Sequence, residues 1–198
     1  MRKLLTIAAA VLVAGTAAAT SATANTKVFD PATKTWMKIG PGAHSGKSPI
    51  DKKVVSYDGG QAPGTVIIDT GERRLYYVMS GGRAMKYGIG VGREGFQWAG
   101  TKHISRKAEW PGWTPPPQMV ARERRKGRKL PSYMEGGPNN PLGARAMYLG
   151  SSLYRIHGSN EPWTIGQAVS SGCIRMANED VIDLYDRVDV GAKVIVKR

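Results

Sequence analysis

The chain contains one cysteine, Cys173, within the sequence SSGCIRM near its C-terminus. An intramolecular disulfide needs two cysteines, so this thiol has no partner within the chain. The thiolate is the nucleophilic form, and a free cysteine is only a few per cent ionised at neutral pH, so a reactive cysteine needs a base. His157 is the histidine nearest to Cys173 in the sequence. We therefore interpret Cys173 as a nucleophile and His157, within hydrogen-bond reach of it, as general base and acid.

The residues beside Cys173 are of types that assist acyl transfer. Gly172 lets the backbone approach a ligand closely, so amides in this region can stabilise an oxyanion. Arg175 supplies positive charge, either for a substrate carboxylate or for the fold around the thiol. Ser170 and Ser171 are interpreted as hydrogen-bonding residues at the substrate rather than as reagents. The alternative, a small apolar core cysteine, does not fit flanks of serine, glycine and arginine.

The spacing of the histidines gives no sign of a metal centre. The three histidines are scattered, and none is spaced from Cys173 as in a zinc finger. We expect no metal and no cofactor, because thiol chemistry can carry both halves of an acyl transfer. His44 and His103 are expected to be surface or structural residues.

The N-terminus has the pattern of an export signal. Residues 2–3 are basic, residues 4–13 are apolar, and Ala-Thr-Ala at 22–24 is a small-x-small cleavage site. This pattern predicts a signal peptide over 1–24 rather than a membrane anchor, since the apolar run is too short to span a bilayer. We expect a periplasmic protein without a membrane span. A lone thiol is a liability in an oxidising compartment, which favours a function for Cys173.

Composition favours one β-rich domain with basic surfaces. The 198 residues include 25 Gly, 12 Pro and only 2 Phe, which is typical of many turns and short strands. The formal net charge is +14. In an exported protein the partners that suit this charge are anionic lipid head groups or a cell wall that bears carboxylates, rather than nucleic acid. The basic run RERRKGRK at 122–129 is either a solvated loop or a docking patch.

Strand-like segments fill the part of the chain after Gly64. The segments are TVIIDT, RRLYYVMS, AMKYGIGVG, residues 101–108, ARAMYLG, SLYRIHG and KVIV. The Gly pairs between the first of them are placed where hairpin turns need positive φ. Residues 25–61 are polar and are expected to be an arm or linker with one short strand at 53–57. Ordered structure is expected to begin at Gly64.

Two further segments differ from this pattern. Residues 109–141 are rich in proline, so we expect a structureless, lid-like loop with neither a central strand nor a long helix. Trp110 and Trp113 within it are either anchors or walls of a groove. Residues 178–188 form the clearest helix, with Asn178 as N-cap and Gly191 ending it.

The cysteine motif resembles that of a known family. The segment 156–176, with His157-Gly158 followed by SSGCIRM, resembles the signature of the L,D-transpeptidase catalytic domain family of the YkuD type. The likeness extends upstream through NPLG at 140–143 and Arg145, and covers roughly 62–198. Many family members carry histidine where this chain has Ser171, so that position is expected to differ in function here.

The resemblance implies a mainly β fold, a mixed β-sandwich with one or two helices and a lid over the cleft. It also implies peptidoglycan stem tetrapeptides as substrate. Cys173, activated by His157, would form a thioacyl-enzyme and release D-Ala, with the carbonyl of Gly158 orienting the imidazole. The acceptor would be an amine of another stem or of a wall-linked protein. In such a fold Tyr148 and Trp163 are expected to pack in the core rather than to line the groove.

Three alternatives compete with this interpretation. Water as acceptor would make the protein an L,D-carboxypeptidase. A non-catalytic wall-binding module would explain the basic charge but not the retained thiol. A papain-like peptidase is excluded by residue order, because its histidine follows the cysteine whereas His157 precedes Cys173 and no histidine follows.

Overall fold

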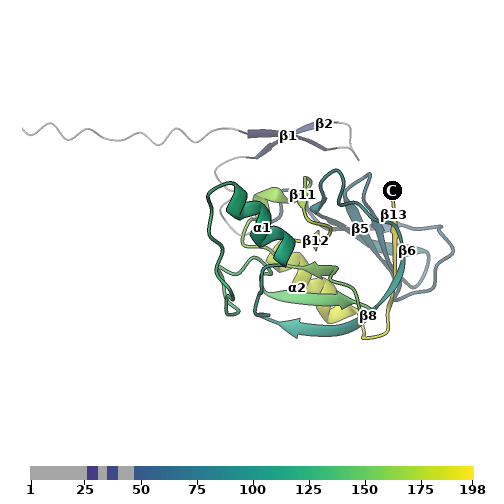
Figure 1. Cartoon of the computed structure of the whole chain (residues 1–198). Helices are drawn as coiled ribbons and strands as arrows, with labels where there is room; N and C mark the ends of the chain where they lie inside the picture. The colour runs from purple at the N-terminus through teal and green to yellow at the C-terminus, as the bar shows by residue number, and fades with distance from the viewer. Residues whose placement is uncertain (1–25, 31–34, 40–46) are drawn as a thin grey trace, which may run out of the picture.

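The structure is a computed structural model that describes residues 26–30, 35–39 and 47–198 (Figure 1). The expected signal peptide and His44 lie outside the described residues. No helix of the described part of the chain is long and apolar enough to cross a bilayer.

Strands and two α-helices make up the described fold. The strands are β1 (Thr26–Asp30), β2 (Thr35–Ile39), β3 (Lys53–Ser56), β4 (Val66–Asp69), β5 (Arg74–Met79), β6 (Arg83–Gly88), β7 (Val91–Gly92), β8 (Gly100–Glu109), β9 (Arg145–Leu149), β10 (Arg155–His157), β11 (Ala168–Ser170), β12 (Ile174–Arg175) and β13 (Lys193–Lys197). The helices are α1 (Pro117–Arg125) and α2 (Asn178–Arg187), with a 3₁₀ turn, η2, at Pro162–Thr164. The expectation of a mainly β fold with one or two helices is confirmed.

A curled nine-stranded mixed sheet organises the fold, in the order β12-β10-β9-β8-β13-β4-β5-β6-β3. Strand β8 joins its two halves. The first part of β8 pairs with β13 and the second with β9, and the register shifts between Ile104 and Arg106. A bulge of this kind bends the strand and increases its twist. The sheet therefore curls at β8 and encloses a core.

Apolar side chains from the strands and from α2 fill that core. Ile68, Leu75, Met147 and Ile156 are each 0% exposed, and burial of such a side chain contributes about 1.5–3 kcal/mol. Helix α2 adds its apolar face to the same cluster, mainly through Leu184. This packing fixes the position of the α2 N-terminus, which lies beside the site described below.

The segment before Gly64 is more ordered than expected. The expected short strand is present as β3, which forms the edge of the large sheet. Upstream of it, the N–H of Ser48 donates to Glu179 on α2 at 3.2 Å. A Cβ on Gly88 would lie 2.6 Å from Ile50, so Ile50 packs directly against β6. Strands β1 and β2 also pair as an antiparallel hairpin, which the polar composition did not predict.

Local expectations had mixed outcomes. The proline-rich segment is not structureless, because it contains α1, which begins at Pro117, but this helix of 9 residues is short, as expected. Proline is favoured in the first turn because its missing N–H has no partner there in any case. Asn178 is not the N-cap of α2; Ala177 is, and the helix ends at Arg187, before Gly191. The Gly81-Gly82 turn has the predicted positive φ, at 72° and 63°.

Candidate active site

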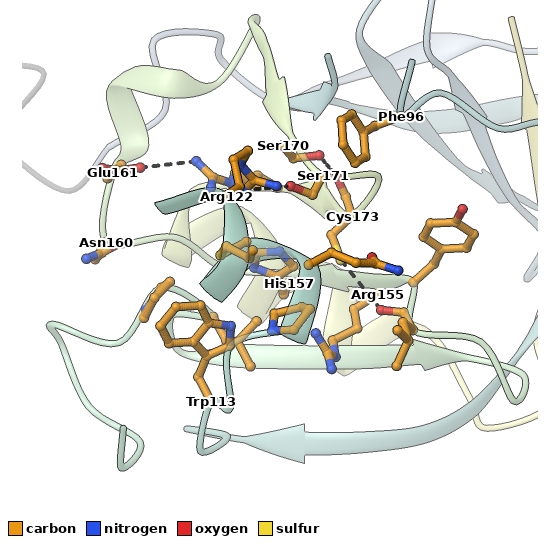
Figure 2. A pocket seen from close by; sticks show the side chains of 18 residues that line it. Phe96, Trp113, Arg122, Arg155, His157, Asn160, Glu161, Ser170, Ser171 and Cys173 are labelled. Atoms are coloured by element: carbon orange, nitrogen blue, oxygen red, sulfur yellow. Dashed lines mark hydrogen bonds and ion pairs between the residues drawn. The ribbon is translucent and has the colours of Figure 1, made fainter. Parts of the chain in front are cut away.

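The sheet brings Cys173 and His157 together. Strands β10 and β12 run parallel, and His157 at the end of β10 is opposite Arg175 at the end of β12. Cys173 immediately precedes β12. Both residues line one cavity of about 540 Å³ (Figure 2). Helix α1 forms another wall of this cavity through Met119 and Arg122, which agrees with its place beside β12 in Figure 1.

The imidazole of His157 is buried and held by the backbone. The side chain is 4% exposed, and Nδ1 lies 2.6 Å from the carbonyl oxygen of Gly158. A carbonyl only accepts hydrogen bonds, so this contact assigns the proton to Nδ1 and leaves the lone pair on Nε2. Burial lowers the pKa of His157 to about 3, and the nearby Arg175 and Arg155 contribute to that lowering. The ring is therefore neutral near pH 7.

Cys173 is a neutral thiol in this arrangement. Burial raises the pKa of its thiol, although the positive charges of Arg155 and Arg175 oppose that rise. The sulfur donates a hydrogen bond to the carbonyl of Leu153 at 3.7 Å. That bond goes to a backbone oxygen and not to His157, so the expected direct thiol–imidazole hydrogen bond is not present here. Thiol and imidazole share a cavity as two neutral groups.

The backbone before Cys173 is fixed by Ser170. Its hydroxyl donates to the carbonyl of Cys173 at 2.6 Å and accepts from the N–H of Gly172 at 3.1 Å. Ser170 is 3% exposed. Both of these bonds are local, so Ser170 shapes the cysteine loop, and it also lines the cavity.

Gly172 has a conformation that requires glycine. Its φ is +105°, and a Cβ there would lie 2.6 Å from the ring of Tyr154. Trp98, whose ring stacks on Tyr154 with centroids 4.6 Å apart, donates to the carbonyl of Gly172 at 2.9 Å. Because the N–H of Gly172 already donates to Ser170, the hydrogen-bond pattern opposes its expected use toward an oxyanion. Among the described residues, the N–H of Cys173 has no hydrogen-bond acceptor.

The N-terminus of α2 supports the backbone that holds His157. Asn178 Oδ1 accepts from the N–H of Ala144 at 2.9 Å. A Cβ added to Gly158 would lie only 2.3 Å from the same oxygen, and a Cβ added to Gly143 would lie at the same distance from it. The NPLG segment and Gly158 are therefore packed around one amide side chain. Close packing around this side chain therefore fixes the backbone on both sides of His157.

The other expected site residues also line the cavity. Arg175 forms an ion pair with Glu161, with Nη1 and Oε2 separated by 3.1 Å. Ser171 accepts a hydrogen bond from Arg122 Nη2 at 3.5 Å. Trp113 lines the cavity while its backbone bridges to Met134, so it is both wall and anchor.

The remaining aromatic and histidine residues lie elsewhere. Trp110 is 43% exposed and does not belong to the cavity wall. Tyr148, expected in the core, is only half-buried, and the guanidinium carbon of Arg106 lies 3.7 Å from the centroid of its ring. Trp163 belongs to η2, outside the cavity wall. His103 is exposed, as expected.

Sequence reasoning missed two arginines of the cavity. Arg155 is two positions before His157 on β10, and side chains two apart in a strand point to the same face. That alternation was a usable signal. Arg122 gave no such signal, because its place depends on α1 and on how that helix lies against the cysteine loop.

Comparison with known proteins agrees with this geometry. Residues 63–196 match the YkuD family, described as the L,D-transpeptidase catalytic domain. The chain belongs to this family. It is 39% identical over 134 residues to the probable L,D-transpeptidase ErfK/SrfK of Escherichia coli K12, and 40% identical over 134 residues to the probable L,D-transpeptidase YbiS of the same strain. These matches cover 65% of this chain but only 42% and 43% of the relatives, so the chain spans less than half of their length.

Solved structures have the same fold. L,D-transpeptidase 3 from Mycobacterium tuberculosis aligns with a TM-score of 0.52 at 16% identity, over 68% of this chain and 60% of that one. A structure from Brucella melitensis, named a probable carnitine operon oxidoreductase, is 45% identical, with a TM-score of 0.50 over 78% of this chain and 98% of that one. The family match and the curated relatives therefore assign residues 63–196 to the L,D-transpeptidase catalytic domain family.

Proposed function

We propose that this protein is an exported cysteine L,D-transpeptidase that acts on peptidoglycan stem tetrapeptides through a thioacyl-enzyme. One observation carries the proposal: Cys173 and His157 line the same cavity, with His157 Nδ1 held 2.6 Å from the carbonyl of Gly158. This contact supports Nε2 as the atom that takes the thiol proton. Membership of the YkuD family supports the substrate class.

The first half-reaction begins from two neutral groups. Cys173 Sγ turns from the carbonyl of Leu153 toward Nε2 of His157, which accepts its proton as the sulfur attacks the carbonyl carbon of the third stem residue. The C–N bond to the terminal D-Ala breaks, and the proton on Nε2 passes to the leaving amine. Because the resting imidazole is neutral, it is ready to accept a proton at every pH well above 3.

The tetrahedral intermediate needs a donor for its oxyanion. The N–H of Gly172 is engaged by Ser170, whereas the N–H of Cys173 has no partner among the described residues. We assign the oxyanion contact to the Cys173 amide, and to Gly172 the positive φ that presents it. One such donor is typically worth about 10²–10³ in rate.

The second half-reaction transfers the acyl group to an acceptor. An amine of a second stem, or of a wall-linked protein, attacks the thioester while His157 takes the amine proton and returns one to the sulfur. If water attacks instead, the product is a tripeptide stem and the activity is L,D-carboxypeptidase. Arg175 and Ser171 line the cavity and are proposed to contact the substrate; Ser170 holds the loop.

The location proposed for this chemistry is the periplasm. The N-terminal pattern of 1–24 supports export, and the net charge of +14 suits a wall polymer that carries carboxylates. A role of the protein in building the cell wall follows from the same substrate.

The name of the Brucella structure raises oxidoreductase activity as a second function. Residues 90–95, GVGREG, have the G-x-G-x-x-G spacing of dinucleotide-binding loops. That motif works when a helix begins at the glycines and presents its N-terminus to the pyrophosphate. Here the run contains β7 and leads through a turn to β8, so its context does not support a dinucleotide site.

Incubation with a disaccharide-tetrapeptide, followed by mass analysis, tests the proposal. The wild type is expected to gain the mass of the substrate without its terminal D-Ala, and Cys173→Ala is expected to gain no mass. A cross-linked dimer, an amino-acid exchange product or a tripeptide identifies the acceptor. A non-catalytic wall-binding module would form no adduct, would react with a thiol probe like an ordinary buried cysteine, and would bind wall equally well as Cys173→Ala.

A further inference from the structure

The cavity around Cys173 carries more positive than negative side chains. Its charged lining residues are three arginines, Arg122, Arg155 and Arg175, and one glutamate, Glu161. Arg175 is paired with that glutamate at 3.1 Å. The other two arginines have no carboxylate of the cavity wall as partner. A concave, partly desolvated site lined by one sign of charge focuses the field and attracts ligands of the opposite sign.

Arg155 lies beside the sulfur with part of its guanidinium unsatisfied. Its Nε is buried and has no hydrogen-bond partner among the described residues. The guanidinium lies over the ring of Tyr148, 5.4 Å from its centroid, and its charge acts on Cys173. An orphaned buried donor at a nucleophile is costly to keep, which points to a ligand that completes it.

Arg122 reaches the cavity from helix α1. On α1, residues Gln118, Met119 and Arg122 face the cavity, whereas Ala121 and Arg124 belong to a groove on the opposite face. The Arg122 side chain is 20% exposed, and its Nη2 is 3.5 Å from Ser171 Oγ, as Figure 2 shows. A hydrogen bond that long is weak, so a carboxylate can displace it.

The acid nearest to Arg122 is already shared. Glu123 Oε1 lies 3.4 Å from Arg122 Nε, but Glu123 also binds Lys126 at 3.6 Å and Arg128 at 2.7 Å. The shortest of the three contacts is the one to Arg128, outside the cavity wall. Arg122 is therefore one of three cations that share this carboxylate, and its Nη2 is directed to Ser171 in the cavity wall.

We propose that Arg122 and Arg155 form a carboxylate-binding subsite that selects acidic donor stems, with one free carboxylate on the stem residue whose carbonyl is transferred to Cys173 and one on the residue that leaves. This inference rests on the proposed function and specifies its donor. Guanidinium binds carboxylate through two parallel N–H···O bonds, so amidation of the substrate removes both the charge and one acceptor. Because Arg122 is on α1, binding of a carboxylate there would also hold the helix over the cavity.

Matched substrates test the subsite. Three tetrapeptides are compared by the rate of thioacyl-enzyme formation in intact mass spectra. In the first, both of these carboxylates are free. In the second, the carboxylate on the residue that donates the acyl group is amidated, and in the third both are amidated. Each amidation is expected to lower kcat/KM by about 10- to 100-fold, mainly through KM, as expected for loss of a hydrogen bond to a charged group. Equal rates for the free and the doubly amidated peptide would overturn the subsite while leaving the transpeptidase assignment intact.

Matched variants assign the selectivity to these residues. Arg122→Gln and Arg155→Gln are expected to slow acylation by the free peptide and to reduce its advantage over the amidated one. Arg124→Gln, on the outer face of α1, and Arg106→Gln, on the other side of Tyr148, are expected to leave both rates unchanged. If Arg122→Gln and Arg155→Gln retain the full preference for the free peptide, the assignment is wrong.

Alkylation of Cys173 tests the anion preference without any stem peptide. Iodoacetate carries a carboxylate, and iodoacetamide is its neutral counterpart, so the ratio of their rates reports the charge felt beside the sulfur. This ratio is expected to fall at least several-fold in Arg122→Gln and Arg155→Gln relative to wild type and to Arg124→Gln. An unchanged ratio contradicts the subsite, whether or not a stem peptide acylates the enzyme. Absence of acylation by every stem peptide would instead count against the proposed function.

Discussion

Nδ1 of His157 lies 2.6 Å from the carbonyl oxygen of the next residue, Gly158. This contact replaces the carboxylate that orients the histidine in a serine protease triad. A neutral carbonyl fixes the tautomer but does not stabilise a positive charge as an acid would. The pKa of His157 is accordingly lowered to about 3, because burial is opposed only by this one backbone bond. The imidazole is therefore expected to be protonated only when it takes the proton of the Cys173 thiol during the proposed reaction.

Replacement of His157 by glutamine is expected to abolish thioacyl-enzyme formation, with a loss of about 10²–10⁴ in rate, because the general base is gone. The side chain of glutamine is of similar size and polar, so the fold is expected to persist. Intact mass spectra after incubation with tetrapeptide measure the acylation, and circular dichroism measures the fold. His103→Gln is the matched control on the exposed surface. Wild-type acylation by His157→Gln would remove this residue from the mechanism.

The stability of the protein should decrease as pH falls below 6.5 because of His157. In the unfolded chain the ring takes up a proton near 6.5, whereas in the folded protein it does so only near 3. Between these values the unfolded state binds more protons, so the free energy of unfolding falls by about 1.4 kcal/mol per pH unit. Denaturation by urea at several pH values checks this. In His157→Gln that part of the slope should disappear, and an unchanged slope would contradict it.

Asp180 is expected to act in the opposite direction. Burial raises its pKa from 3.8 to about 6, although Lys52 opposes the rise. The folded state therefore binds the extra proton between pH 3.8 and 6, and the stabilisation that this provides is lost as pH rises through 6. Asp180 is 2% exposed, and its Oδ2 has no hydrogen-bond partner among the described residues. Asp180→Asn should raise the free energy of unfolding at pH 8 relative to wild type; a lower value would show that the contact with Lys52 dominates.

Substitution of Gly172 by alanine should destabilise the protein and inactivate it. A residue other than glycine at φ +105° costs about 1–3 kcal/mol, and the Cβ would lie 2.6 Å from Tyr154. The loop that carries Cys173 would shift, and acylation should fall at least 100-fold. Gly191→Ala is a control, since its φ of +93° is similar but no atom lies within 4 Å of the new Cβ. If both variants lose the same stability and both stay active, packing against Tyr154 is not the reason for glycine.

Asn178→Ala should weaken the support of the His157 backbone. The N–H of Ala144, a residue that is 1% exposed, would lose its acceptor, at a cost of about 1–3 kcal/mol. Acylation should fall as well, because Gly158 packs against the same oxygen. Asn178→Asp keeps an acceptor oxygen and should retain most stability. Thermal unfolding and acylation rates measure both effects, with the exposed Asn139→Ala as control; equal behaviour of Asn178→Ala and that control would contradict the role.

The strands could be predicted, and Cys173 and His157 could be singled out as a candidate pair, because their signals are local. Runs of β-branched and aromatic residues such as those of β4 and β5 favour strands between glycine turns. Helix α2 likewise has its own amphipathic pattern, yet its N-cap was predicted wrongly. Asn178 has the side chain of an N-cap, but its oxygen bonds to Ala144, far away in the sequence, and Ala177 takes the cap position. Long-range contact decided between two locally acceptable roles.

The sequence by itself determined that a lone cysteine, an upstream histidine and a β-rich domain belong together, because residue types and short spacings carry that information. Only the tertiary structure decided how the two groups meet. Pairing of β10 with β12 places them in one cavity, and burial keeps both neutral. Arg122 on α1 reaches Ser171 across 49 residues of sequence. Such a contact depends on the packing of α1 against the cysteine loop, which no local pattern of residues specifies.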